Sequence, residues 1–108
     1  MDLEKMQKVN EILQLCFEIN RFEQRQKEKT GDKPTIFAWF SGHSASFEIR
    51  VYEKGWYADK KNNIKPDKQM YLYLDEPLKN VEKSLDNCIQ YLNKLKEREN
   101  NEYLQQAI

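Results

Sequence analysis

Three short segments in the middle of this chain alternate between two kinds of side chain, and this alternation most constrains its fold. The segments run from Thr35 to Ser41, from Ser46 to Glu53 and from Gln69 to Leu74. Successive side chains of a β-strand point to opposite faces of its sheet, so the segments predict strands with two different faces. One face would carry Ile36, Ala38, Phe40, Phe47, Ile49, Val51, Met70, Leu72 and Leu74, and the other Phe37, Trp39, Glu48, Arg50, Tyr52, Tyr71 and Tyr73. The first set is an ordinary core, whereas the second is aromatic and contains an Arg–Glu pair.

Helical patterns flank the three predicted strands. From about Asp2 to Lys29 we expect one helix, because residues recur at steps of three and four as in a single buried stripe. This predicted stripe consists of Leu3, Met6, Val9, Leu13, Cys16, Phe17 and Asn20. A second helix is expected after Asp75, which can cap free backbone N–H groups, with Pro77 in its first turn. Its apolar stripe consists of Leu78, Val81, Leu85, Cys88, Leu92 and Leu95.

These elements predict a single α+β domain over residues 1–108, with a flexible tail from about 99 to 108. The economical assembly is a two-layer sandwich, in which both helices cover the apolar face of an antiparallel meander of three to four strands. The aromatic face would then lie uncovered, and a soluble monomer seldom exposes a large apolar patch. We therefore expect a homodimer or a higher homo-oligomer, formed through the sheet or through the seams of the helices.

Composition limits the partners of this chain. It has 18 Lys and Arg residues against 18 Asp and Glu residues, and this balance argues against a DNA or RNA polymer as partner. A small anion held by a few local arginines remains compatible with it. We expect no membrane partner, because no apolar run approaches the length of a span, and no signal peptide is recognisable. Cys16 and Cys88 are expected to be buried free thiols, which together with the missing signal peptide predicts a cytoplasmic protein.

Catalytic and metal-binding patterns are not found in the sequence. The single histidine, His43, lies between serines in a predicted hairpin loop, and neighbours in a turn do not supply an oriented nucleophile and base. Two separated cysteines and one histidine fit no zinc spacing, and the loop of residues 59–68 lacks the pattern of a calcium site. There is no Gly-rich phosphate loop. We therefore expect a protein that is not an enzyme and holds neither metal nor cofactor.

The few arginines are the candidate ligand-binding residues. Arg50 lies in mid-strand between Glu48 and Tyr52, either as part of a solvated ion pair or as an anion-binding group beside aromatic rings. Arg21 and Arg25 stand one turn apart on the polar end of the first predicted helix, where they could grip a second phosphate or simply be solvated. Arg98, near the end of the second helix, could fold over a pocket shared with a neighbouring subunit.

The run FAWFSGHSASFEIRVYEKGW, followed by a polar loop, a YLYLD strand and a Pro-initiated helix, resembles small early-region proteins of phages of Gram-positive bacteria. Among these it is most similar to the Thoeris anti-defence 1 family, phage proteins that sequester cyclic nucleotide signals of host immunity without cleaving them. The resemblance implies oligomers with ligand pockets between subunits. It implies ligand-binding roles for Arg21, Arg25, Arg50, Arg98, Tyr71 and Asn80, with Tyr73 and Asn87 as alternatives to the last two.

Three functions remain open at this point. The first is a sponge for a small anionic nucleotide, either a cyclic ADP-ribose isomer or a cyclic oligonucleotide. The second is an anti-CRISPR-like inhibitor that binds a host defence protein through the aromatic sheet face, since Tyr, Trp and Arg are the usual hot-spot residues of protein interfaces. The third is a dimeric domain whose aromatic face is only its own interface.

Overall fold

The computed structural model describes residues 2–61 and 64–107, and for residues 102–107 the backbone alone. In chain order the elements are α1 (Leu3–Asn20), α2 (Lys27–Thr30), β1 (Thr35–Ser41), β2 (Ser46–Tyr52), β3 (Lys68–Tyr73) and α3 (Leu78–Ala107). The three strands form one antiparallel sheet in the order β1–β2–β3, with Phe37 opposite Arg50 and Glu48 opposite Tyr71. The predicted α+β fold is confirmed. The strand bounds differ from the predicted ones by a single residue, at the end of β2 and at both ends of β3.

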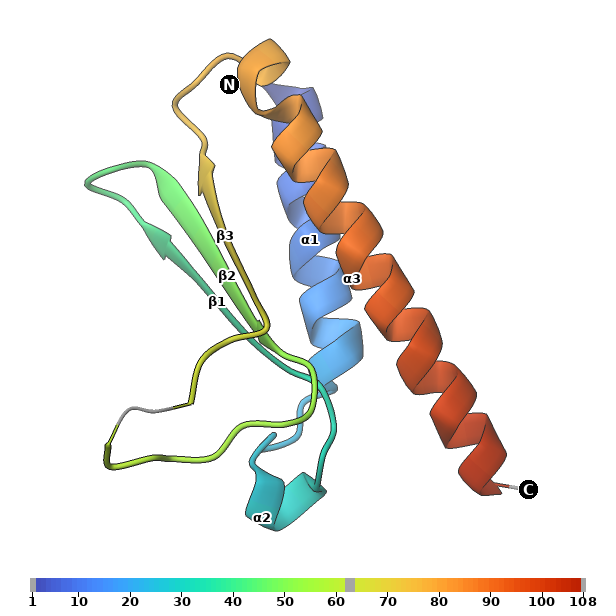
Figure 1. Ribbon diagram of the computed structural model, residues 1–108. Coiled ribbons are helices and arrows are strands. Elements are labelled where there is room, and N and C mark those ends of the chain that lie inside the picture. The colour runs from blue at the N-terminus through green and yellow to red at the C-terminus, as the bar shows by residue number, and fades with distance from the viewer. Residues whose placement is uncertain (1, 62–63, 108) are drawn as a thin grey trace.

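Two helices cover one face of the sheet (Figure 1). α1 packs along α3 and over β1, while α3 packs over β3. The shared core holds Ile12, Leu15, Cys16, Ile19, Ile36, Phe47, Ile49, Val51, Leu72, Val81, Leu85, Cys88, Ile89, Leu92 and Leu95. The predicted stripe of the second helix and one predicted face of the sheet thus meet in a single hydrophobic core. The stripe predicted for the first helix was wrong for most of its members: Leu3 and Phe17 are exposed, and beside Cys16 the helix α1 buries Ile12, Leu15 and Ile19 instead.

The first helix is shorter than the sequence predicts. Asp2 caps it, accepting from the Lys5 N–H at 3.1 Å, but it ends at Asn20 and not near Lys29. The Asn20 side chain donates to the Ile36 carbonyl and accepts from the Ile36 N–H, both at 2.9 Å. The side-chain amide therefore hydrogen-bonds to β1 as the backbone of a neighbouring strand would. The next residue, Arg21, has φ 60° and is no longer helical. This tertiary bond stops the helix where sequence periodicity alone does not, so the prediction of one helix to Lys29 was wrong.

The loop end of the β1–β2 hairpin extends away from the helices (Figure 1). Ala38 and Phe40, which the alternation assigns to the core, are consequently exposed, Phe40 by 59%. Their side chains lie on the helix-facing side of β1, but the strands diverge from α1 here (Figure 1), and a hollow of about 330 Å³ lies between Phe40 and the Met6 and Val9 side chains of α1. Their assignment to the core was wrong for this reason.

Helix α3 is the longest element and begins directly after Pro77. Its backbone stays helical to Ala107, through most of the polar segment that the sequence predicts as a flexible tail. Two contacts hold the later part of α3 to the rest of the fold. Arg98 donates to Glu53 at 2.6 Å, and Glu99 accepts from Arg25 at 2.9 Å. Within the described residues, no helix combines the length and the apolar character that crossing a membrane requires.

Candidate functional site

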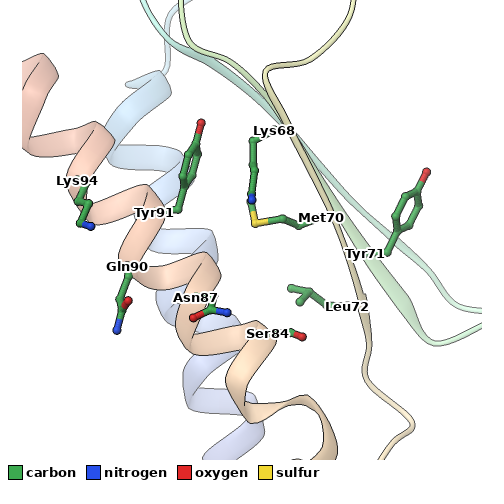
Figure 2. Close-up of a pocket in the computed structure, with 9 residues that line it drawn as sticks. All are labelled: Lys68, Met70, Tyr71, Leu72, Ser84, Asn87, Gln90, Tyr91 and Lys94. Carbon is green, nitrogen blue, oxygen red and sulfur yellow. The ribbon is translucent and has the colours of Figure 1, made fainter.

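The largest hollow described lies between the edge strand β3 and the helix α3, and we call it the β3–α3 groove. Its volume is about 460 Å³, within the range typical of small-molecule sites. The lining residues come from two elements, and Figure 2 shows them: Lys68, Met70, Tyr71, Leu72, Ser84, Asn87, Gln90, Tyr91 and Lys94. Met70 and Leu72 form an apolar floor, whereas α3 supplies hydrogen-bonding groups.

The positions on α3 follow from helical spacing. Ser84, Asn87, Tyr91 and Lys94 recur at steps of three, four and three, so they share one helix face. This face lies beside the buried stripe that packs on the core. Figure 2 shows Ser84 and Tyr91 on the side of α3 toward β3, whereas Lys94 lies on the outer side of the helix. The fold of α3 against the sheet thus creates the groove without any special loop.

The charge of the β3–α3 groove is positive. Lys68 and Lys94 line it, and none of its lining residues carries a carboxylate. Neither lysine makes an ion pair with another described residue. Ser84, Asn87 and Gln90 add neutral donors and acceptors. This combination fits an anionic ligand that also carries polar edges.

Tyr91 closes one end of the groove. The Lys68 ammonium lies 5.9 Å from the centre of its ring, and Figure 2 shows the two side chains next to each other. The Tyr91 hydroxyl is buried and has no hydrogen-bond partner among the described residues. Burial, and after it the negative charge of Glu53, raises the pKa of Tyr91. The phenol is therefore neutral at physiological pH.

The predicted aromatic face exists, on the side of the sheet away from the helices. The Arg50 guanidinium lies 4.9 Å from the centre of the Trp39 ring, and its Nε donates to Glu48 at 2.7 Å. Gln69 donates to the same Glu48 oxygen at 2.9 Å and to the Tyr71 hydroxyl at 2.8 Å. Arg50 and Tyr71 are therefore brought together, in a network that already contains a carboxylate.

The Glu48 carboxylate is held in its charged form. Burial opposes ionisation, but the hydrogen bonds from Gln69 and Arg50 outweigh it and lower the pKa of Glu48. The same bond to Glu48 raises the pKa of Arg50. The pair is neutral as a whole, so it attracts an anion less than an isolated guanidinium would.

Arg25 is buried inside the fold and is bonded to other groups of the protein. It lies in the loop after α1, so it does not stand one helical turn from Arg21, and the expected pairing of the two on α1 was wrong. Its side chain is buried and donates to the carbonyls of Asn20 and Pro34 and to the carboxylate of Glu99. Arg21 is the residue directly after α1.

Arg98 and Asn80 lie far apart along α3. Arg98 is paired with Glu53 and lines a smaller hollow of about 290 Å³. This second hollow contains the carboxylates of Asp32, Glu53, Asp67 and Glu99 against two cations, Lys54 and Arg98. Its excess of negative charge disfavours an anion. Asn80 donates to Glu76 at the exposed start of the helix.

The six residues expected to bind a ligand do not converge on one pocket within the protomer. Of these six, only Tyr71 lines the β3–α3 groove, and Asn87, the alternative to Asn80, lines it too. Lys68 and Lys94 were missed because the chain has many lysines and single ones give no sequence signal. The repeat of Ser84, Asn87, Tyr91 and Lys94 beside the apolar stripe is the pattern that could have indicated Lys94.

Metal chemistry finds no support in the described residues, which contain no group of three or more His, Cys, Asp or Glu side chains able to hold an ion. His43 is exposed in the loop between β1 and β2. Comparisons with protein-family models, with curated proteins and with solved structures find no match for this chain.

Proposed function

We propose that this protein binds a small anionic ligand of the nucleotide class in the β3–α3 groove and holds it without chemical change. The observation that carries the proposal is the presence of both Lys68 and Lys94 along a groove of about 460 Å³ without a lining carboxylate. Ammonium groups bind phosphate as point charges, so two of them suit a ligand with separated phosphates.

The other lining groups suit the remainder of a nucleotide. Asn87 and Gln90 can read the edge of a base through paired donor and acceptor atoms, and Ser84 can bond a sugar hydroxyl. Met70 and the Tyr91 ring offer apolar surface for a base. A role as a sponge for cyclic ADP-ribose isomers or cyclic oligonucleotides, which the resemblance implies, is one form of this function.

Titration calorimetry with glycocyclic ADP-ribose, a cyclic dinucleotide and a cyclic trinucleotide tests the proposal. We expect at least one of them to bind and to be recovered intact after heat denaturation of the complex. Lys68→Ala and Lys94→Ala should each weaken its binding by about 10- to 100-fold, since a hydrogen bond to a charged group contributes about 1.5–3 kcal/mol. Failure of all three ligands to bind a folded sample would contradict the proposal.

Two control variants locate the site. Lys83→Ala removes the same charge from the same helix but lies outside the groove, so binding should remain unchanged. Arg50→Ala removes the guanidinium of the aromatic face. If Arg50→Ala abolished binding and Lys94→Ala did not, the ligand would lie on the aromatic face and not in the groove.

A protein partner is the second candidate function. Tyr71 and Tyr73 of the aromatic face are 51% and 55% exposed, and side chains of this kind are common hot spots. An inhibitor of a host factor would retain one bacterial protein at equal stoichiometry in a pull-down, and Tyr73→Ala would release it. Retention that is unaffected by Tyr73→Ala would speak against the aromatic face as its contact.

A further inference from the structure

The outer edge of β1 is one of the two edges of the sheet that pair with no other strand among the described residues. β1 lies at one side of the sheet, and β3 with the β3–α3 groove lies at the other. Natural sheets protect such edges with charges, prolines or a covering segment, because unpaired backbone groups invite another strand. Thr35–Ser41 contains neither a charged residue nor a proline.

Asn20 shows which backbone groups of β1 point outward. Its side chain bonds both the N–H and the C=O of Ile36, so these two groups face the free edge. Backbone groups alternate in direction along an antiparallel strand, and those of Ala38 and Phe40 therefore face the same edge. No hydrogen bond to these outward groups is found among the described residues.

We propose that β1 pairs with β1 of a second copy of this chain in an antiparallel manner, joining the two sheets into one. Asn20 sets the register, since it already occupies Ile36 and leaves only Ala38 and Phe40 for an incoming strand. Ala38 of each copy then faces Phe40 of the other, which forms four hydrogen bonds. The two Trp39 residues face each other beside the two-fold axis.

The side chains of β1 are complementary to themselves in this register. On the helix-facing side the small Ala38 leaves room for the exposed ring of Phe40 from the second copy. On the other side the two Trp39 rings form a cross-strand aromatic pair, which stabilises a sheet. Because β1 has no charged residue, pairing β1 of the two copies brings no like charges together.

Exposed apolar surface beside this edge could supply a large part of a dimer interface. Phe17, Phe22, Trp39 and Phe40 are 52%, 94%, 39% and 59% exposed, and Phe17 and Phe22 stack at 5.7 Å between ring centres. Because a buried aromatic side chain covers about 150–250 Å², these four offer roughly 450 Å². This is more than half of the about 800 Å² that each partner buries in a typical stable interface.

The dimer is independent of the ligand site. The β3–α3 groove lies at the opposite edge of the sheet, so pairing through β1 leaves the groove of each copy open. The inference goes beyond the proposed function, and either can fail without the other.

Light scattering after gel filtration tests the assembly. At a concentration of tens of micromolar we expect twice the protomer mass of 13.1 kDa. Phe40→Lys should convert the protein to a monomer, because it places a charge at the edge without disturbing the core. Tyr73→Lys adds the same charge on the aromatic face near β3 and should leave the dimer intact. A monomeric wild type, or a dimer lost only in Tyr73→Lys, overturns the proposal.

Cysteine cross-linking tests the register. Facing residues that are not hydrogen-bonded to each other have Cα atoms about 4.5 Å apart, within the range of a disulfide. Trp39→Cys should therefore give a covalent dimer on mild oxidation, while Ser41→Cys should not, since its partner copy lies about 13 Å away along the strands. Cys16 and Cys88 are buried and do not interfere. Circular dichroism confirms that the variants fold, and equal cross-linking through Ser41→Cys would overturn the register.

Discussion

At the scale of single residues, the arginines show how far side-chain chemistry can be interpreted without a fold. Their scarcity suggests ligand binding, yet Arg25 is buried in a structural ion pair and Arg50 is neutralised by Glu48. A sequence gives the charge of a side chain but not its partner, because Arg25 and Glu99 are brought together only by the tertiary fold. The lysines of the groove were overlooked for the same physical reason.

Replacing Arg25 with Ala should destabilise the fold strongly. The change leaves the Glu99 carboxylate buried without its partner, and breaking a buried pair in this way costs about 3–5 kcal/mol. The free energy of unfolding from urea denaturation measures the loss. The exposed pair at Arg98 serves as comparison, and Arg98→Ala should cost less than about 1 kcal/mol. Equal losses in the two variants would contradict the structural role of Arg25.

The carboxylate of Glu48 should make stability depend on pH. Its pKa in the folded protein lies below the ordinary value of 4.5, so its contribution is complete above that value and disappears as the pH falls through the folded pKa. Urea denaturation at neutral and at acidic pH should show a smaller acid-induced loss for Glu48→Gln than for the wild type. If the wild type and Glu48→Gln lost the same free energy of unfolding at acidic pH, Glu48 would not contribute to this pH dependence.

At the scale of elements, periodicity predicted the core stripe of α3 and the three strands, but it assigned the wrong face of α1 to the core, since Ile12, Leu15 and Ile19 are buried while Leu3 and Phe17 are exposed. It did not predict the end of α1, since Asn20 stops the helix through a bond to Ile36, sixteen residues further on. Nor did it show that the loop end of the β1–β2 hairpin diverges from the helices, because alternation gives the face of a side chain and not what covers that face. The groove could not be predicted either, since it depends on how α3 lies along β3.

Asn20→Ala should weaken the attachment of β1 to the end of α1. It removes two hydrogen bonds to Ile36, a loss of about 1–3 kcal/mol at about 0.5–1.5 kcal/mol for each bond. Asn20→Asp keeps the acceptor for the Ile36 N–H but sets a carboxylate oxygen against the Ile36 carbonyl oxygen, so it should not restore the stability that Asn20→Ala loses. Chemical denaturation measures both variants, and an unchanged Asn20→Ala protein would show that the amide has no such role.

At the scale of the whole molecule, one core joins α1, the sheet and α3. Cys16 and Cys88 lie inside it, from opposite ends of the chain, and the predicted burial of both thiols agrees with the structure. Burial raises the pKa of each thiol to about 12, and for Cys88 the neighbouring Cys16 adds to the effect. Both groups are therefore unreactive while the core is closed.

Thiol labelling should report the opening of the whole core. With Ellman's reagent at mildly alkaline pH, we expect neither cysteine of the native protein to react faster than the protein unfolds, and both to react at once in guanidinium chloride. A variant with an exposed thiol, Ser44→Cys, is the positive control. Rapid labelling of one native cysteine would show that its helix opens independently of the core.

The bond between Arg25 and Glu99 also has a consequence for the order in which the chain acquires its structure. α1 is made first, but the helix that covers its apolar stripe and the carboxylate that neutralises Arg25 are synthesised some seventy residues later. Contacts between such distant segments slow folding, since a long loop must close before they form. During synthesis the nascent α1 therefore remains an exposed amphipathic segment, and the protein completes its fold only after nearly all of the sequence has left the ribosome.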